Sequence, residues 1–321
     1  MAPAPVRWIA PALVVALAAA LPWLVPGYYV QLATKMLIVG IAAMALNLAV
    51  GFGGMVSMCH AAFYGVAGYI LALAAPEADP ASVWLVLPLA AGGAGLLALA
   101  IGALSLRTRG IYFIMVTLAF GEMMFFLFHD TTIAGGSDGT YIYFKPTLAI
   151  AGWSPVDLER PAAFYGLVLA LTVAVVLLLA AITRSPFGRA LAAARDNERR
   201  ARALGFPVYR VRLTAYGISG AIAGLAGFFA AAQFGFVAPQ LLGWHLSATI
   251  LVMVVLGGMG SVTGPLAGAV LLLGLEEVLK ETTEHWKLVE GAIVIVLVLA
   301  LPGGARQLAT MVLPERERRD G

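Results

Sequence analysis

Long apolar stretches separated by short polar connections run through most of the chain. A membrane-crossing helix needs about 17 to 25 mostly apolar residues. Single stretches of that length are found at 9–25, 83–104, 111–129, 162–183, 213–236 and 288–304. An uncharged run at 36–75 is long enough for two more crossings, and the glycine-rich group Gly51 to Gly54 is where we expect the chain to break between them.

The apolar segment at 247–274 does not fit this pattern. Glycines and a proline divide it into two pieces of about ten residues each, too short to cross comfortably. The residues expected to break it are Gly257, Gly258, Gly260, Gly264 and Pro265. Broken backbone at membrane depth is tolerated where protein or a polar cavity surrounds it. We therefore expect a re-entrant pair of half-helices beside eight crossings, although ten full crossings would give the same polarity.

The two glycine-rich breaks share a short pattern. Gly53 and Gly54 begin GGMVS, and Gly257 and Gly258 begin GGMGS. Transporters built from two related halves carry broken helices at corresponding positions. With 36 glycines in the chain, chance is an equal rival explanation.

Composition agrees with a membrane protein. The chain has 61% hydrophobic and 12% charged residues, against about 25% charged in soluble domains. The fold class expected is therefore an all-α polytopic membrane protein, with residues 1–321 as one domain. The N-terminal 26 residues resemble a signal peptide, but no polar domain follows, which favours an uncleaved first crossing.

An arginine-rich segment interrupts the apolar pattern between residues 184 and 212. Ser185 suits an N-cap, Pro186 the first helical position and Gly205 a left-handed C-cap, so we expect one helix over about 185–205, of about five turns. Short positive loops stay in the cytoplasm. Either this helix only sets the topology, or it docks into another protein and transmits movement.

The same rule orients the rest of the chain. Arg107 and Arg109 fall on the side of the arginine-rich segment, and Glu77 and the loop at 129–161 on the opposite side. With a re-entrant pair, the C-terminal tail also lies on the cytoplasmic side; its basic residues are Arg306, Arg316, Arg318 and Arg319. Both termini are thus expected in the cytoplasm.

Several classes of chemistry lack their motifs in this sequence. It contains no GxxxxGK[ST] phosphate loop, no HExxH and no paired cysteines, so neither ATP hydrolysis nor a metal centre is expected. Cys59, the single cysteine, lies in an apolar run and is interpreted as a packing residue. The basic segment is too short and isolated for a nucleic-acid surface, and anionic lipid or an acidic protein groove fits it better.

Polar residues inside the predicted crossings are candidates for lining a pathway, because they are costly in lipid. Glu122 is the acid nearest the middle of a crossing, and it could equally lie near headgroups or bond a neighbouring helix. The remaining candidates are Asn47, Ser57, His60 and Thr117. A hydrogen bond between helices would explain each of these four without a substrate.

Five ordered segments identify a family resemblance: GFGGMVSMCHAAFYGVAGY (51–69), LRTRGIYFIMVTLAFGEM (106–123), AGGSDGT (134–140), the basic helix, and GGMGSVTGPLAGAV (257–270). Together they resemble the longer of the two membrane permeases of bacterial ABC importers for branched-chain amino acids. The resemblance covers about residues 30–305. It implies a bacterial inner-membrane protein that works with a second, different permease, two cytoplasmic ATPases that bind the ATP and Mg, and a periplasmic binding protein.

The resemblance also implies where the ATPases are contacted. The coupling residues it indicates are Arg195, Asp196, Asn197, Glu198, Arg199, Arg200, Ala201 and Gly205. The sequence departs from the general EAA-x-x-x-G pattern of ABC importers, since Arg199 and Arg200 occupy its first two positions. The coupling role therefore depends on location and on the family's own variant of the motif.

The substrate expected from the resemblance is a branched-chain amino acid. Related permeases that take urea, short amides or aromatic acids are the alternative, because the binding protein supplies most of the selectivity. An ion-driven secondary transporter using Glu122 is a further alternative from another class.

Overall fold

The computed structural model describes residues 6–75, 79–149 and 157–300, with the side chains of α1 described from Leu13 onward. Glu77 and the four arginines of the C-terminal tail lie outside these ranges, as does the end of the last predicted crossing. Within them the chain is almost entirely helical. The helices are α1 (Val6–Leu24), α2 (Gly27–Asn47), α3 (His60–Ala74), α4 (Val83–Ser105), α5 (Ile111–Asp130), α6 (Pro161–Arg184), α7 (Pro186–Asp196), α8 (Glu198–Ala203), α9 (Val208–Phe234), α10 (Trp244–Gly257), α11 (Gly264–Thr282) and α12 (Trp286–Ala300).

Among the described residues, five helical segments are long and apolar enough to cross a membrane. They are Gly27–Phe52, Val83–Ser105, Ile111–Asp130, Pro161–Arg184 and Val208–Phe234. The first joins α2 to a π-helical turn, Leu48–Phe52. Three shorter apolar helices, Leu13–Leu24, His60–Ala74 and Trp244–Gly257, add to them. The expectation of an all-helical, multi-pass membrane protein is confirmed.

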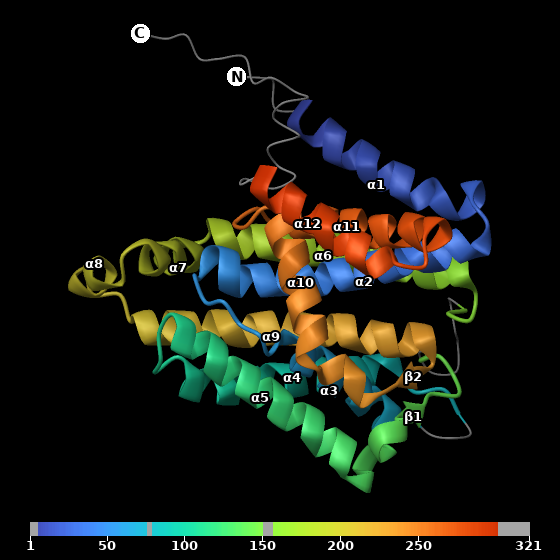
Figure 1. Cartoon of the computed structure of the whole chain (residues 1–321), viewed down its shortest axis with the longest axis horizontal. Coiled ribbons are helices and arrows are strands. Elements are labelled where there is room, and N and C mark those ends of the chain that lie inside the picture. Colours follow the sequence, from blue (N-terminus) through green and yellow to red (C-terminus); the bar gives the residue numbers. More distant parts are fainter. Residues whose placement is uncertain (1–5, 76–78, 150–156, 301–321) are drawn as a thin grey trace.

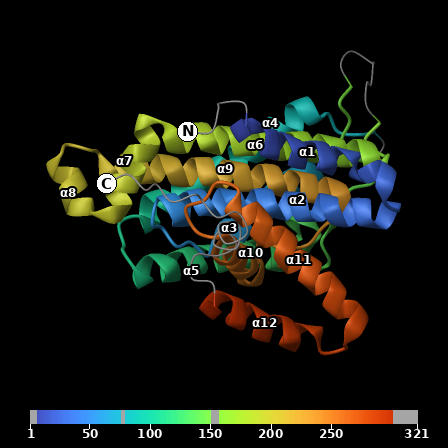
Figure 2. The same ribbon diagram turned by 90° about the horizontal axis from the view of Figure 1, so that it is seen from above.

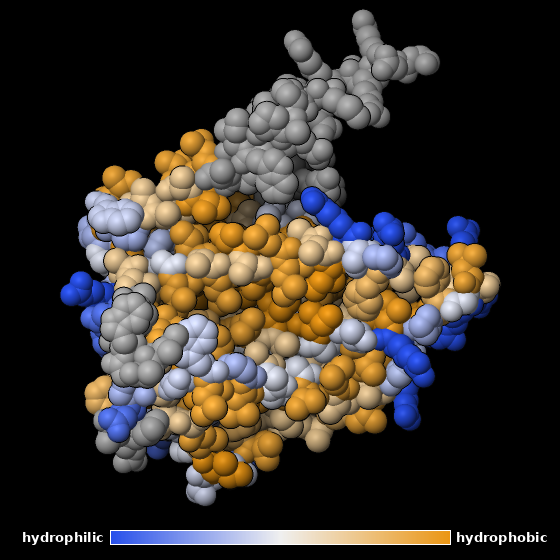
Figure 3. Space-filling model, turned by 180° about the vertical axis from the view of Figure 1, so that it is seen from behind, coloured by the Kyte–Doolittle hydropathy of each residue, from blue (hydrophilic) through white to orange (hydrophobic). Residues whose placement is uncertain are grey.

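The long helices α2, α6 and α9 run side by side along one direction (Figures 1 and 2). Figure 3 shows, on the face opposite that of Figure 1, a broad apolar band between two more hydrophilic ends. Such a band fits the hydrocarbon layer of a bilayer, with the helix direction across it.

Helix α9 forms the centre of the bundle because its surface is built from small residues. Gly220 and Gly224 face Ala98 and Ala94 of α4, and a Cβ at Gly227 would overlap the backbone of Tyr64 in α3. Small residues of this kind let helix backbones approach closely in membranes. As a result 83% of the apolar window of α9 is buried, against 17% for α5, which lies at the surface.

The two ends of the bundle differ. At one end α7 and α8 project beyond α2, α6 and α9; at the other end, the short strands β1 (Thr140–Tyr141) and β2 (Phe236–Val237) pair antiparallel (Figure 1). Arg109 lies 3.0 Å from Glu198 of α8, so the connection between α4 and α5 shares the end of the arginine-rich segment. The predicted grouping of these two segments on one side is thus confirmed.

Three predicted boundaries are wrong. Helix α2 begins at Gly27 rather than near residue 36, because Tyr28, Gln31 and Lys35 interrupt the apolar pattern without interrupting the helix. The first break follows Phe52 and extends to Cys59, beyond the predicted Gly51 to Gly54. Helix α11 has 19 residues rather than about ten, since its second half is polar yet helical.

The predicted pair of half-helices becomes α10 and α11. Helix α10 crosses the direction of α2 and α9 steeply in Figure 1, and Figure 2 looks nearly along it. The chain turns at 258–263, where Gly258 and Gly260 have φ of 98° and 80°. Close packing of the two helices requires glycine, since a Cβ at Gly257 would overlap the carbonyl group of Gly264. Pro265 occupies the first turn of α11, where a missing amide proton costs nothing.

Candidate functional site

The arginine-rich segment is two helices rather than the single helix expected from its caps. The predicted ends are confirmed: the hydroxyl of Ser185 accepts from the amide of Gly188, and Gly205 has φ of 85°. The amides of Gly205 and Phe206 donate to the carbonyl groups of Arg202 and Ala201, which is a Schellman closure. Between these ends Asn197 is extended, with φ of −154° and ψ of 97°.

Asn197 is the residue that ends one helix and starts the next. Its side-chain oxygen accepts from the amide of Arg200 at 2.9 Å, as an N-cap does. Asparagine favours this position because it bonds the backbone locally. The sequence prediction missed this break because Ser185 and Gly205 were interpreted as the two ends of one continuous helix. The segment is therefore an elbow, with α7 against the bundle and α8 beyond it.

The inner arm of the elbow holds the first break directly. Arg195, in the last turn of α7, donates from Nη1 to the carbonyl oxygen of Gly51, and its stem lies against Gly54. Gly51 belongs to the π-helical turn that ends α2. The last carbonyl groups of a helix lack intrahelical partners, and Gly51 lies in the last turn before the break, so an arginine can bond there.

The second break is joined to the same place through Asn47. The side-chain oxygen of Asn47 accepts from the amide of Gly260 at 3.1 Å, and its nitrogen donates to the carbonyl oxygen of Ser261 at 2.7 Å. A Cβ at Gly51 would overlap the Asn47 side chain and approach the amide of Gly260. Arg195 lies beside Gly54 of the first GGMxS segment and Gly260 of the second, so the two segments, 204 residues apart in register, approach each other under this arginine.

The outer arm is fixed by Glu198, the first residue of α8. Its carboxylate accepts from Arg109 at 3.0 Å, from Arg212 at 2.9 Å and from Arg202 within α8. Arg212 also donates to the carbonyl oxygen of Ala194 at 3.0 Å. One carboxylate thus ties together α8, α9 and the start of α5, with 16% of its side chain exposed. Arg109 and Arg212 had no assigned partner in the sequence analysis.

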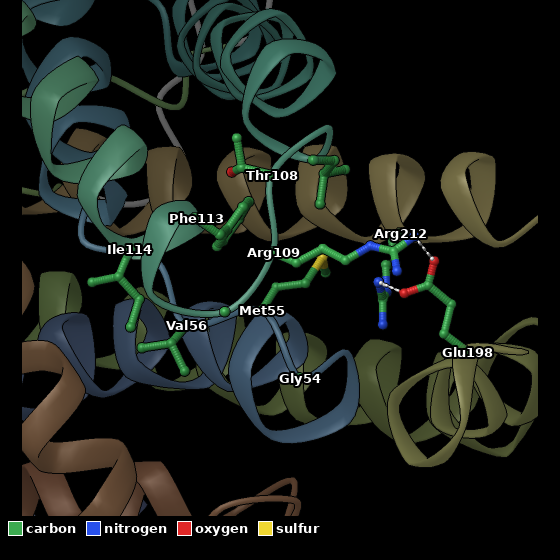
Figure 4. Close-up of a pocket in the computed structure, with 11 residues that line it drawn as sticks. Gly54, Met55, Val56, Thr108, Arg109, Phe113, Ile114, Glu198 and Arg212 are labelled. Carbon is green, nitrogen blue, oxygen red and sulfur yellow. Dashed lines mark hydrogen bonds and ion pairs between the residues drawn. The ribbon is translucent and has the colours of Figure 1, made fainter.

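A cavity of about 210 Å³ lies beside this cluster (Figure 4). Arg212 and Glu198 lie at one end of it and Val56, Phe113 and Ile114 at the other, with Arg109 and Met55 between them. The cavity lies between the start of the first break, Gly54 to Val56, and the first turn of α5. Space there would allow the elbow and the start of α5 to move without first breaking a packed core.

The other predicted coupling residues divide between inside and outside. Ala201 is buried with Ala194 and Val208, which seats α8 on α9. Asp196, Arg199 and Arg200 are exposed, and no ion pair to either of these two arginines occurs within the described residues. Two apolar side chains that the sequence analysis did not single out, Leu204 and Phe206, are 69% and 41% exposed beyond them.

Two of the pathway candidates lie in a buried hydrogen-bond network. His60 bonds the hydroxyls of Ser57 and Ser219 at 3.2 and 2.7 Å, and Ser57 bonds that of Tyr216 at 2.8 Å. Ser219 donates onward to the carbonyl oxygen of Ala45. His60, Ser57 and Ser219 are each 0% exposed. The network fastens the first break to α9 and α2, using Tyr216 and Ser219, which periodicity alone does not distinguish from core residues.

Thr117 and Glu122 both lie on α5 but differ in setting. Thr117 is buried and its hydroxyl accepts from the amide of Met58 at 3.2 Å, inside the first break. Glu122 is half-buried, and its Oε1 accepts from the amide of Trp244 at 3.2 Å, at the first residue of α10. The structure thus brings Ser57, His60 and Thr117 together around one break and puts Asn47 and Glu122 at opposite ends of α10. Among the described residues, no group of acidic, His or Cys side chains could hold a metal ion.

Comparison with known proteins places the chain in one family. The profile described as "Branched-chain amino acid transport system / permease component" matches residues 28–299. The chain is 34% identical, over 95% of its length and 75% of the relative's, to the high-affinity branched-chain amino acid transport system permease protein LivM of Escherichia coli. The LivM protein of Salmonella typhimurium matches to the same extent. No solved structure matches the chain.

A more distant group of relatives is also similar. The autoinducer 2 import system permease protein LsrC of Klebsiella pneumoniae is 35% identical over 39% of this chain and 39% of its own. These shorter matches agree with a shared permease architecture. The family match and the long LivM alignment agree with the resemblance seen in the five ordered segments, and the chain belongs to the branched-chain amino acid transport system permease family of ABC importers.

Proposed function

We propose that this chain forms part of the translocation pathway of an importer for branched-chain or closely related amino acids in the bacterial inner membrane. A different permease chain would complete the pathway, two cytoplasmic ATPases would bind the elbow, and a periplasmic binding protein would deliver the solute at the β1–β2 end. The termini would lie in the cytoplasm, and ATP and Mg would be bound by the ATPases alone.

One observation carries this proposal: the elbow is exposed at its far end, and at its near end Arg195 bonds Gly51, which lies directly before the first break and against the side chain of Asn47. The exposed end offers Leu204 and Phe206 beside the exposed side chains of Arg199 and Arg200. Apolar anchors rimmed by arginines are typical of a protein contact. The near end reaches the first break through Arg195, and Asn47 continues the connection to the second break.

This arrangement gives a physical route from ATP to the membrane. A push on α8 would move Glu198, and with it Arg109 in the connection before α5 and Arg212 on α9. The same push on α7 would pull on the carbonyl group of Gly51. Substrate and nucleotide would each have to favour one of the two resulting states, as linkage requires.

The experiment is co-purification and uptake with the complete set of subunits. Leu204→Glu combined with Phe206→Glu should remove ATPase binding while leaving the permease pair intact in detergent. Tyr143→Glu, a change of an equally exposed side chain in the loop that follows β1, is the control and should retain the ATPases. Uptake of L-leucine by the wild-type assembly must require ATP; uptake by this chain alone, driven by an ion gradient, would refute the proposal.

A further inference from the structure

Helix α5 carries an acidic side chain on the least buried of the five candidate membrane-crossing segments. Only 17% of its apolar window is buried, and Met115, Met123 and Phe126 are each more than half exposed. Glu122 lies near the middle of this helix and is half-buried. A carboxylate at this depth facing hydrocarbon would be costly, so this side of α5 must face protein or a water-filled path.

The carboxylate has one oxygen in use and one available. Oε1 accepts from the amide of Trp244, at the positive end of the α10 dipole, which fixes the side chain in place. Within the described residues no ion pair or second hydrogen bond engages Glu122. A carboxylate accepts but does not donate, so its remaining oxygen suits a donor from outside the chain.

Glu122 lies close to the first break and to the start of α10. Thr117 and Gly121, on the buried edge of α5, lie against Met58 of the first break. Ser247, one turn into α10, accepts from the amide of Ala61 at the start of α3 at 3.0 Å. Substrate sites in membrane transporters form near the midplane beside such discontinuous helices.

Exposed aromatic side chains stand at the start of α10, whose first amide Glu122 bonds, and they fit an amino acid. Trp244 is 44% exposed, and its ring stacks on that of His245 with centroids 3.8 Å apart. An indole face attracts an ammonium ion, and methionine and phenylalanine adapt to apolar side chains of differing shape. Neither leucine-like nor smaller apolar side chains would be excluded by such a surface.

We propose that Glu122, flanked by Trp244 and His245, binds the ammonium group of the amino acid as it passes between this chain and the second permease. The inference rests on the proposed function and adds to it a contact point and the chemical group contacted. Binding of the solute at Glu122 would also affect α10, because the same carboxylate bonds the first residue of that helix.

Glu122→Gln is the sharpest test, since glutamine keeps an oxygen for the amide of Trp244 and removes the charge. In proteoliposomes holding the complete importer, L-leucine uptake per ATP hydrolysed should fall about tenfold, as expected when one charge-assisted hydrogen bond is lost. Subunit assembly and melting temperature should stay at wild-type values. Glu281→Gln, a neutralisation of an exposed acid at the end of α11, is the matched control and should change none of these.

The outcomes separate the possible roles. Unchanged uptake by Glu122→Gln, in an importer whose wild type takes up leucine, would refute the ammonium contact alone. Loss of the second permease from the complex would also refute it and make Glu122 an interface residue. Absence of ATP-dependent leucine uptake by the wild type would refute the proposed function, and this inference with it.

A second measurement tests whether water reaches residue 122. Cys59, the chain's single cysteine, is buried, so the labelling of this chain, followed by its own band on a gel, has a low background. In Glu122→Cys a membrane-impermeant thiol reagent should react, and turnover with leucine should slow the reaction. A cysteine that stays unlabelled would mean that lipid or protein seals this face, which contradicts the proposal.

Discussion

The two glycine-rich breaks share the pattern GGMxS but are held in opposite ways. The first, at 53–59, is fastened by side chains from two helices: Thr117 of α5, and Tyr216 and, through His60, Ser219 of α9. Ser247 of α10 also accepts from the amide of Ala61 at the start of α3. The second, at 258–263, is bonded to the rest of the bundle by the single side chain of Asn47, among the described residues.

Their exposure differs in the same direction. Met55, Ser57 and Cys59 of the first break are buried, whereas Met259 of the second is 58% exposed. A break held on several sides by buried hydrogen bonds is costly to open, because each opened group is left without a partner. We infer that the first break is a fixed support and the second a joint, and that Arg195 and Asn47 connect the joint to the elbow.

The largest expected effect is at the fixed support. His60→Ala should lower the free energy of unfolding by about 3 to 5 kcal/mol, since it leaves a cavity and two buried hydroxyls that lose a partner. Stability of the permease pair in detergent, measured by thermal unfolding, should fall together with uptake. A variant with wild-type stability would mean that the network does not hold the first break.

A smaller loss of stability is expected at Gly257, next to the joint, where α10 and α11 pack backbone against backbone. Gly257→Ala puts a methyl group into the carbonyl group of Gly264, so α10 and α11 must separate. The cost should reach about 3 kcal/mol, near the upper end for overpacking. Gly291→Ala, where a Cβ meets nothing within 4 Å, is the control and should unfold at the wild-type temperature.

Asn47→Ala separates stability from transport and so tests the comparison most directly. Removing two hydrogen bonds to a half-exposed turn should cost only about 1 to 2 kcal/mol. Uptake per ATP hydrolysed should nevertheless fall much more than in His60→Ala variants compared at equal amounts of folded protein. Thr172→Val removes a buried hydroxyl that bonds only its own helix, and it should leave uptake unchanged. Equal losses of uptake in Asn47→Ala and His60→Ala, at equal amounts of folded protein, would contradict the interpretation of the second break as a joint.

The smallest effect on stability is expected at Glu198. The exposed pair with Arg109, which is 64% exposed, contributes about 0 to 1 kcal/mol, and a glutamine oxygen can still accept from Arg212, which is 19% exposed. Glu198→Gln should therefore unfold near the wild-type temperature but weaken the link between ATP hydrolysis and uptake. Added salt should weaken the wild-type coupling in the same direction, because screening acts on the exposed pair. Tight coupling in the variant would exclude Glu198 from the route.

Local signals in the sequence predicted much of this molecule. Long apolar stretches predicted the helices α4, α5, α6 and α9, because a membrane-crossing segment must form all its backbone hydrogen bonds internally and present apolar side chains to the lipid. Ser185, Pro186 and Gly205 gave the ends of the elbow for the same kind of reason, since caps are local hydrogen bonds. Gly53, Gly54 and the glycines at 257–264 indicated where the chain breaks.

Tertiary contacts decided the rest, because they join residues that no local pattern relates. Nothing near Asn47 in the chain predicts Gly260 and Ser261 as its partners, and nothing near Glu198 predicts Arg109. Helix α11 continues through a polar half because packing and its own hydrogen bonds outweigh composition. The sequence therefore determined the crossings, the caps and the positions of the breaks. Only the folded structure decided which break is held fast and which is tied by one side chain, since that depends on buried hydrogen bonds between distant helices.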